Sequence, residues 1–359
     1  MGKIVSVLRN IRDVRLRRSM KPRLLLTVYR KEWLDAELIE ALQERFDVVV
    51  KSVRGRVESQ PAGAVVVSKK RMVVDEARYL MRLSINRQLY QEKWTFVCYG
   101  GHYATLLFAR LLHTVGVRRP VFLLNFYLHE LGQNRWIQLV LRVLLTDDVR
   151  VVAQASADVD YFRTFLPAER VLYLPYCQGA LDLGSYDGTH RNFVFAGGWT
   201  NRDYDALLRC AARLPHVEFV VVASAQSAIT EPQPANTTLL YDLGPREFHR
   251  LMAESYLVVL PLKEDVGSSG QMVALAAMQL GKAVIAPDIG AINDYIANGI
   301  TGSFYRLGDD EGLVRLIDDS FAAPACVDAM GRAGQQRYME LFTPESFYSP
   351  VTEFIYTSI

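Results

Sequence analysis

The sequence predicts an α/β protein built from two doubly wound domains, each with a parallel sheet. Short apolar runs alternate with stretches of helical spacing almost throughout the chain, which is typical of parallel sheets covered on both faces. The pattern breaks near 175–191, a stretch rich in Gly, Tyr and Asp. The length of 359 residues agrees with two domains, since one domain usually takes roughly 100–200 residues.

Each half of the chain supplies its own series of strands. In the first half 23–29 is apolar, and Leu34, Leu38 and Leu42 lie four residues apart in a helix expected over 33–44. The other strands expected in this half cover 47–51, 64–67, 95–99, 121–125, 149–153 and 171–174. The second half has expected strands at 192–196, 218–224, 238–241, 256–260 and 283–286, and expected helices over 203–214, 246–254 and 271–280. Because such sheets bind ligands at the carboxyl ends of their strands, two facing domains predict an active site in the cleft between them.

Composition excludes several classes of protein. Half of the residues are hydrophobic and 22% are charged, so the chain can build real cores and is not a disordered protein. The four cysteines lie far apart without a CxxC pair, which argues against a zinc ribbon or a disulfide framework and fits a reducing compartment. No apolar run reaches the roughly 18 residues of a membrane span, and no cleaved signal is expected.

Charge is unevenly distributed along the chain. Residues 1–190 contain 29 Lys and Arg against 19 Asp and Glu, whereas 191–359 contain 12 against 20. A basic first half favours an anionic surface such as lipid headgroups. Nucleic acid is not expected as a partner, because the basic residues form no known reader motif.

Two stretches carry possible membrane signals. Residues 1–22 form a basic segment whose apolar residues have helical spacing, so an amphipathic helix on a membrane is expected there; a disordered start is the alternative. The stretch 135–145 places its basic and polar residues on one stripe. It either lies on a bilayer surface or packs as an ordinary core helix.

The most informative segment is 260–288. A strand ends at Pro261, a loop with Ser268, Ser269 and Gly270 follows, and a helix is expected from Gln271. Unpaired N–H groups and the dipole at a helix start favour an anion such as a diphosphate, and glycine lets a phosphate approach the backbone. An ordinary helix after a flexible loop is the alternative.

Four successive segments of the second half resemble, in order, the carboxyl-terminal domain of GT-B glycosyltransferases, in particular family 4 (group 1). The segment SSGQMVALAAMQLGKAVIA is similar to the family pattern E-G-F-G-L-x-x-L-E-A-M-A-x-G-x-P-V-I-A, and DIGAINDYIANGITGSFYRLGDD resembles the pattern that follows it. FAGGWTNRDYDALLRCAARLP and YDLGPREFHRLMAESYLVVLP resemble the two patterns before it. The first half resembles the family at the level of fold only.

The resemblance implies a GT-B fold, two Rossmann-like domains facing across a cleft. Residues 23–178 are then the acceptor domain, 179–191 a linker and 192–340 the nucleotide-sugar domain, while a helix in 341–359 crosses back to the first domain. The implied reaction transfers a sugar from a nucleoside diphosphate donor. It requires no bound metal and no cofactor besides the nucleotide sugar.

The resemblance also implies donor-binding residues. Arg202 matches the family's loop lysine and is expected, with Gly198, at the diphosphate, because a guanidinium can bind two phosphate oxygens. The alternative for Arg202 is an ion pair with Asp203 or Asp205. The other donor contacts expected are Lys263, Glu264, Ser268, Ser269, Gly270 and Gln271.

The chain departs from the family pattern at three positions. The family's partner arginine falls on Gly197, for which Lys263 is a candidate replacement. The two family glutamates that contact the donor sugar and the ribose fall on Ser268 and Ala276. Glu264 and Asp265 are then candidates to reach the sugar, and Gln271 a hydroxyl or a phosphate. These departures leave open a non-catalytic relative.

Candidates for the base that activates the acceptor follow two strands of the first half. His102 comes after the expected strand 95–99, and His129 and Glu130 come after 121–125. A neutral imidazole can take a proton from an attacking hydroxyl near neutral pH. For each histidine, a role in capping or loop packing is the alternative.

The sequence therefore predicts a metal-independent, hexosyltransferase-like glycosyltransferase of polysaccharide or cell-envelope biosynthesis. It would act in the cytoplasm at the inner face of the cell membrane, contact that membrane through 1–23, and use a saccharide or lipid-linked acceptor. The alternative is a non-catalytic GT-B protein that binds nucleotide or glycan and supports a partner transferase. A nicotinamide-dependent oxidoreductase is less favoured, because no GxGxxG follows a strand with an acidic residue about 20 positions on.

Overall fold

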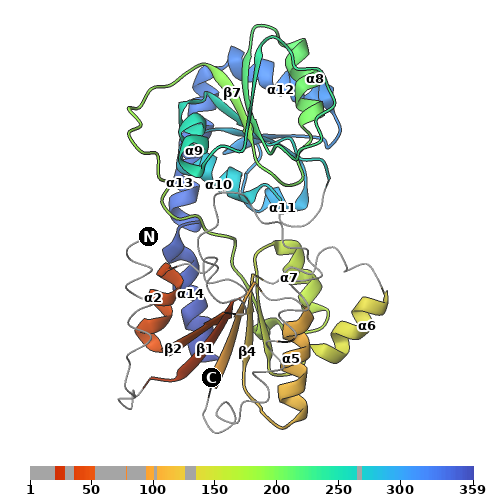
Figure 1. Cartoon of the computed structure of the whole chain (residues 1–359), viewed down its shortest axis with the longest axis vertical. Helices are drawn as coiled ribbons and strands as arrows, with labels where there is room; N and C mark the ends of the chain where they lie inside the picture. Colours follow the sequence, from red (N-terminus) through yellow and green to blue (C-terminus); the bar gives the residue numbers. More distant parts are fainter. Residues whose placement is uncertain are drawn as a thin grey trace. The chain divides into compact units, whose positions relative to one another are not determined.

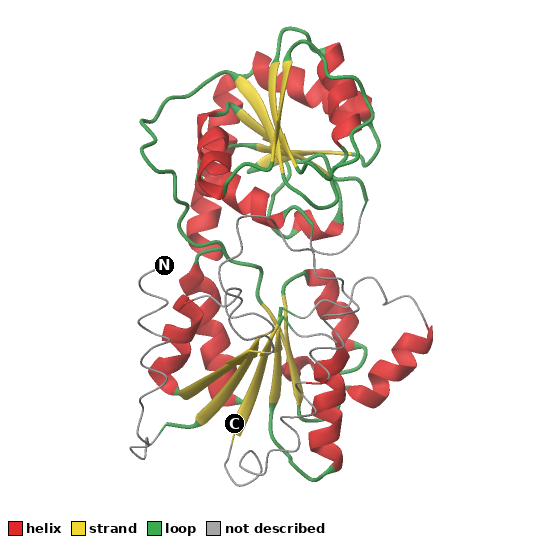
Figure 2. Cartoon of the chain, viewed as in Figure 1, coloured by secondary structure: helices red, strands yellow, loops and turns green. Residues whose placement is uncertain are grey.

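The chain folds into two compact units, each with a sheet flanked by helices (Figure 1, Figure 2). The structure is a computed structural model, and it describes residues 21–28, 36–52, 78, 94–100, 103–125, 135–264 and 269–359. The first unit runs to Leu174 and also includes Phe347–Ile359, and the second spans Pro175–Ser346.

The first unit contains a parallel sheet of six strands within the described residues. These strands are β1 Arg23–Val28, β2 Asp47–Ser52, β3 Trp94–Tyr99, β4 Val121–Leu124, β5 Val149–Ala153 and β6 Val171–Tyr173. Their order across the sheet is β2-β1-β3-β4-β5-β6. All four residues of β4 are buried, as expected for a central parallel strand that is covered on both faces.

Helices connect these strands. Those described are α2 Ala36–Arg45, α5 Tyr103–Thr114, α6 Arg135–Leu144 and α7 Ser156–Arg163, with a short 3₁₀ turn at Ala168–Arg170. The last helix of the chain, α14 Pro344–Thr357, also packs on this sheet: Phe354 meets Phe122 of β4 edge to face, with ring centroids 5.6 Å apart. Glu353 of the same helix pairs with Arg45 at the end of α2.

The second unit repeats the architecture. Its strands are β7 Phe193–Gly197, β8 Glu218–Ala223, β9 Thr237–Tyr241, β10 Leu257–Val259, β11 Val284–Pro287 and β12 Gly302–Tyr305, all parallel, in the order β12-β11-β10-β7-β8-β9. Its helices are α8 Tyr204–Arg213, α9 Pro245–Glu254, α10 Gln271–Gln279, α11 Gly290–Asn293, α12 Asp310–Ala322 and α13 Pro324–Leu341.

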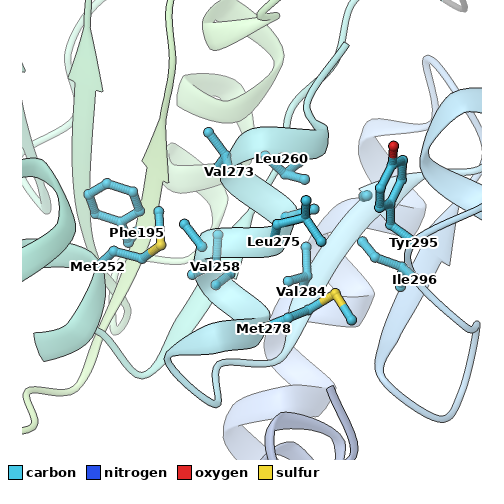
Figure 3. Packing of buried hydrophobic residues seen from close by; sticks show 14 of the residues in the cluster. Phe195, Met252, Val258, Leu260, Val273, Leu275, Met278, Val284, Tyr295 and Ile296 are labelled. Atoms are coloured by element: carbon cyan, nitrogen blue, oxygen red, sulfur yellow. The ribbon is translucent and has the colours of Figure 1, made fainter. Parts of the chain in front are cut away.

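Alternate residues of β7 feed two separate cores on the two faces of the second sheet. Phe193 and Phe195 join one cluster with α9, α10 and α13, and Val194 and Ala196 join the other with α8 and α12. Figure 3 shows the first cluster, in which Leu275 and Met278 of α10 lie against the strands. Apart from Gln271 at its start, the buried residues of α10 are all apolar, and their packing holds this helix in place.

The strands and helices expected from the sequence are found with shifts of a residue or two wherever the structure describes them. β12 was not expected, because only two of its four residues are buried and its apolar run is short. The expected strand at 64–67 and the segment 1–22 lie outside the described residues. Among the residues that are described, no helix is both long and apolar enough to cross a bilayer.

Candidate functional site

Two loops of the second unit are joined at the carboxyl ends of the neighbouring strands β7 and β10. Arg202 and Leu262 form an isolated antiparallel bridge between the loops, and the backbone N–H of Asp203 donates to the Pro261 carbonyl oxygen at 2.7 Å. The Asn201 side chain completes the joint, because its amide donates to the Glu264 carbonyl at 2.8 Å and its oxygen accepts from the Glu264 N–H at 3.1 Å. These bonds place Arg202, Lys263 and Glu264 together at the ligand-binding edge of a parallel sheet.

Arg202 lies folded against its own loop. Its Nε donates to the Gly197 carbonyl oxygen at 3.0 Å and its Nη1 donates to the Thr200 carbonyl oxygen at 2.6 Å. Desolvation by burial lowers the pKa of this guanidinium, but an arginine stays protonated in proteins. The alternative ion pairs with Asp203 and Asp205 do not form: Asp203 caps α8 through the Ala206 N–H, and Asp205 accepts from Thr230. Arg202 therefore has no carboxylate partner among the described residues, and its positive charge remains at this edge.

The guanidinium of Arg202 also restricts position 198 to glycine. Its φ of +127° belongs to glycine, and a Cβ at this position would collide with the guanidinium of Arg202. Behind it, the hydroxyl of the buried Tyr204 lies 2.6 Å from the Gly198 carbonyl oxygen and 3.1 Å from that of Val222. Burial raises the pKa of Tyr204, so this phenol stays protonated and can donate to them. The loop is thus fixed from both sides.

The start of α10 faces the same joint. Gly270 is its N-cap, in a left-handed conformation with φ of +89°, and as a glycine it has no side chain that could cap the helix. The first-turn N–H groups of a helix have no acceptor within it, so this end presents N–H donors and a partial positive charge. A Cβ on Gly270 would lie 3.2 Å from Cδ1 of Leu262 and 3.1 Å from Cδ1 of Ile292, which shows how closely the helix start approaches the bridged loop.

Ser269 and Gln271 flank Gly270 at this helix start, and both are buried. Within the described residues, the Gln271 side chain has no hydrogen-bond partner, so its amide is available to a ligand. Lys263 and Glu264 are exposed beside them. The structure therefore brings together seven of the predicted donor residues: Gly198, Arg202, Lys263, Glu264, Ser269, Gly270 and Gln271.

The aromatic pair next to this loop was not anticipated from the sequence. Trp199 is about half exposed, and its ring stacks on Phe248 of α9 with centroids 5.4 Å and planes 26° apart. The Phe248 ring lies where a side chain at Gly197 would be: a Cβ there would be 2.5 Å from Cε2 of the ring. Position 197 matches the family's partner arginine, so an aromatic stack takes the place of a charge. The exposed Trp after Gly-Gly was the signal in the sequence, but Phe248 is 49 positions away.

The other residues named from the family pattern are either buried in the core or outside the described part of the chain. Ala276, which matches a family glutamate, is buried in the apolar cluster of α10 and offers no polar side-chain contact. His102, His129, Glu130, Ser268 and Asp265 lie outside the described residues, so their roles stay predictions. In the described part of the chain, no group of three or more His, Cys, Asp and Glu side chains is placed to hold a metal ion.

Comparisons with solved structures define the class of fold. Sucrose-phosphate synthase from Thermosynechococcus elongatus superposes with a TM-score of 0.68 at 14% identity, covering 94% of this chain and 98% of that one. HepE from Anabaena, solved in complex with UDP-glucose, superposes with a TM-score of 0.63 at 15% identity, covering 94% of this chain and 100% of that one. With the two six-stranded parallel sheets, these similarities establish a GT-B fold of two Rossmann-like domains.

Sequence comparison finds a family that residues of the second unit match. Residues 190–321 match the family described as Glycosyl transferases group 1. An α-maltose-1-phosphate synthase from Mycobacterium tuberculosis is 35% identical over 99 residues, which are 26% of this chain and 24% of that protein. The matched segment thus spans about a quarter of this curated relative. The resemblance inferred from the four segments is confirmed: residues 190–321, which contain the donor part of the candidate site, match the group 1 glycosyltransferase family.

Proposed function

We propose that this chain is a glycosyltransferase that moves a sugar from a nucleoside diphosphate donor to a saccharide or lipid-linked acceptor. One observation carries the proposal: the glycine-capped start of α10, Arg202 and Lys263 converge at the carboxyl ends of β7 and β10, inside the segment that matches group 1. Three sources of positive potential, none of them paired with a carboxylate of the described residues, suit a diphosphate.

In the proposed reaction these groups stabilise the leaving diphosphate. The acceptor hydroxyl attacks the anomeric carbon, the bond from that carbon to the phosphate oxygen breaks, and the negative charge that develops on the diphosphate is met by the α10 N–H groups and by Arg202 and Lys263. Donors fixed in advance, as those of this hydrogen-bonded loop are, need no reorganisation as the charge develops. The acceptor proton passes to a base of the first domain, for which His102, His129 and Glu130 remain the candidates.

The donor base is proposed to lie against Trp199. Its exposed face is flat and supported from behind by Phe248, and stacking on such a face is worth about 1–3 kcal/mol per base. The solved relative HepE is in complex with UDP-glucose, which makes UDP-glucose the first donor to test here. We expect transfer to proceed in EDTA, because Arg202, Lys263 and the start of α10 stabilise the leaving diphosphate, as a metal ion does in metal-dependent transferases.

We also propose that the protein acts at the cytoplasmic face of the membrane, in the synthesis of cell-envelope glycans. It rests on the basic first half of the chain and on the basic segment 1–22. The acceptor is then a lipid-linked saccharide presented at the bilayer.

A non-catalytic protein that binds the nucleotide or a glycan and supports a partner transferase is the second candidate. It is favoured by Ala276, where the family glutamate is replaced by a buried apolar side chain. The two are separated by turnover: release of nucleoside diphosphate from the donor in the presence of a membrane extract containing acceptors. Sustained release that Arg202→Ala abolishes supports the transferase, whereas binding without release supports the second candidate.

A further inference from the structure

The helices α5 and α6 of the first unit carry an exposed apolar surface on their outer sides. On α6 the exposed apolar positions follow the spacing i, i+3, i+4 and i+7, which is one continuous stripe of a helix. On α5 they are four residues apart, and the two helices contact each other. This surface, the α5–α6 surface below, consists of Leu107, Leu111, Val115, Trp136, Leu139, Val140 and Val143.

The exposed stripe of α6 is distinct from the side of the helix that packs in the core. Leu141 and Leu144 face the core cluster of the first unit and are buried, while Trp136 is 76% exposed and Leu139 is 55% exposed. In Figure 1, α6 lies at the outside of the first unit beside α5. A helix that is apolar both toward the core and away from it has more apolar surface than its own fold uses, and exposed patches of this kind mark interaction sites.

The charges around the surface are positive. Neither α5 nor α6 contains an Asp or a Glu, and exposed Arg110 and Arg142 lie on them with no carboxylate partner among the described residues. Both carboxylates that follow α6 are paired: Asp147 accepts from Arg170 at 3.0 Å, and Asp148 bonds at 2.7 Å to His113 in the last turn of α5. Arg118, exposed beyond α5, adds a further charge.

The apolar stripe and the arginines around it indicate which partner the α5–α6 surface binds. In a symmetric dimer a surface meets its own copy, so Arg110 and Arg142 would face like charges in the partner. An anionic bilayer instead accepts apolar side chains at the level of the headgroups and attracts the surrounding arginines. The ten residues of α6 extend only about 15 Å, enough to lie in the interface and too few to cross it. A tryptophan is favoured at that depth.

We infer that the α5–α6 surface is the membrane-docking face of this protein, and that it binds anionic lipid headgroups with its apolar stripe inserted among them. This inference depends on the proposed function in one respect: docking would serve to bring a lipid-linked acceptor to the first domain. Vesicle binding is measured without donor or turnover, so failure of docking and failure of transfer are distinguishable.

The test is flotation of the full chain with vesicles of phosphatidylglycerol and phosphatidylcholine in equal parts, compared with phosphatidylcholine alone. The stripe variant Leu139→Gln/Val143→Gln changes only exposed positions, and circular dichroism verifies its fold. Met339→Gln/Leu341→Gln, at exposed apolar positions of α13, is the matched control. Arg110→Gln/Arg142→Gln tests the charges. Light scattering gives the oligomeric state of each variant.

The wild-type chain is expected to float with the anionic vesicles, and the control is expected to float equally. The stripe variant should bind at least about tenfold more weakly, and loss of each arginine should weaken binding about fivefold at low salt. No flotation of the wild type would overturn the inference. So would a stripe variant that floats like the wild type, which would assign binding to another part of the chain such as 1–22. A wild-type dimer that the stripe substitutions dissociate, without vesicle binding, would overturn it in favour of self-association.

Discussion

Phe248 occupies the space in front of Gly197, so that the last residue of β7 has no room for a side chain and the ring instead supports Trp199. The family's arginine at this position could not be restored without displacing the ring. An aromatic face therefore lies at the edge of β7, where the family pattern has an arginine, and Arg202 follows five residues later. The candidate site thus has an aromatic part, proposed for the base, and a phosphate part, proposed for the diphosphate, and the two can be tested independently.

The aromatic part is tested with Trp199→Ala. Loss of the stacking face should weaken the affinity for the nucleotide about tenfold, because one stacked base is worth about 1–3 kcal/mol. The affinity for the free nucleoside should fall by the same factor, since the contact is to the base. Trp136→Ala, a more exposed tryptophan of the first unit, serves as the control. Calorimetry measures both, and unchanged nucleoside affinity in Trp199→Ala would remove the base from this face.

The phosphate part is tested with Arg202→Ala. Loss of a charged donor to a phosphate should weaken nucleoside diphosphate binding roughly 10- to 100-fold, whereas binding of the free nucleoside should stay the same. Arg213→Ala on α8, which breaks an exposed pair with Glu311, is the matched control and should alter neither. Equal losses for nucleoside and diphosphate would mean that Arg202 only supports the loop.

The start of α10 is tested with Gly270→Ala. The substitution forces a left-handed alanine and brings its Cβ against Leu262 and Ile292, so the helix start must shift, at a cost of about 2 kcal/mol. Gly308→Ala is the control, because Gly308 has a φ of +79° and no atom within 4 Å of such a Cβ, and it should cost about 1 kcal/mol. We expect weaker diphosphate binding in Gly270→Ala alone. Loss of affinity in both variants, or in neither, would contradict the assignment.

Lys282 gives a prediction for the pH dependence of stability. It is buried, its Nζ donates to the Ser255 carbonyl oxygen at 2.6 Å and lies 3.1 Å from Nδ1 of His190, and desolvation lowers its pKa to about 8. Between about pH 8 and the ordinary value of 10.5, the unfolded chain holds a proton that the folded chain has released. The folded state is therefore favoured increasingly as pH rises through this window, and below it the effect is constant.

The effect of this lysine is tested by comparing the stability of Lys282→Met with that of the wild type. The wild type should gain stability relative to the variant as pH rises from 8 to 10, by at most about 3 kcal/mol. Lys51→Met, at an exposed position of β2, controls for the loss of a charge. Urea unfolding at a series of pH values measures the free energy of unfolding of each protein. Parallel curves for wild type and Lys282→Met would show that burial does not shift this amine.

The residues proposed for the phosphate were easier to single out in the sequence than the aromatic pair proposed for the base, for a physical reason. Arg202, Gly270 and Gln271 became candidates because a Gly-rich loop before a helix and a basic loop after a strand are local patterns. The joint that brings them together depends on Asn201, whose amide pairs with Glu264 across 63 positions, and no local pattern predicts such a bond. The Trp199 stack depends in the same way on Phe248.

The fold was predictable because most of its strands are buried on both faces and therefore read as apolar runs. The edge strands β9 and β12 are less buried, with only Thr237 buried in β9 and only Gly302 and Tyr305 in β12, and β12 was not expected. The apolar spacing of 135–145 left a core helix and a surface helix open, and the structure gives α6 both characters: one side packs in the core and the other is exposed.

The most direct test of the central claim is a thermal-shift screen of the purified chain in EDTA against UDP, GDP, ADP, CMP and their common sugar conjugates. A ligand that binds only the folded state raises its stability, by about 2.7 kcal/mol at a hundred times its dissociation constant. We predict that one nucleoside diphosphate and its sugar conjugate raise the unfolding temperature, and that Arg202→Ala reduces the shift while Arg213→Ala does not. Folded protein whose unfolding temperature no nucleotide raises would contradict the donor site at Arg202 and α10.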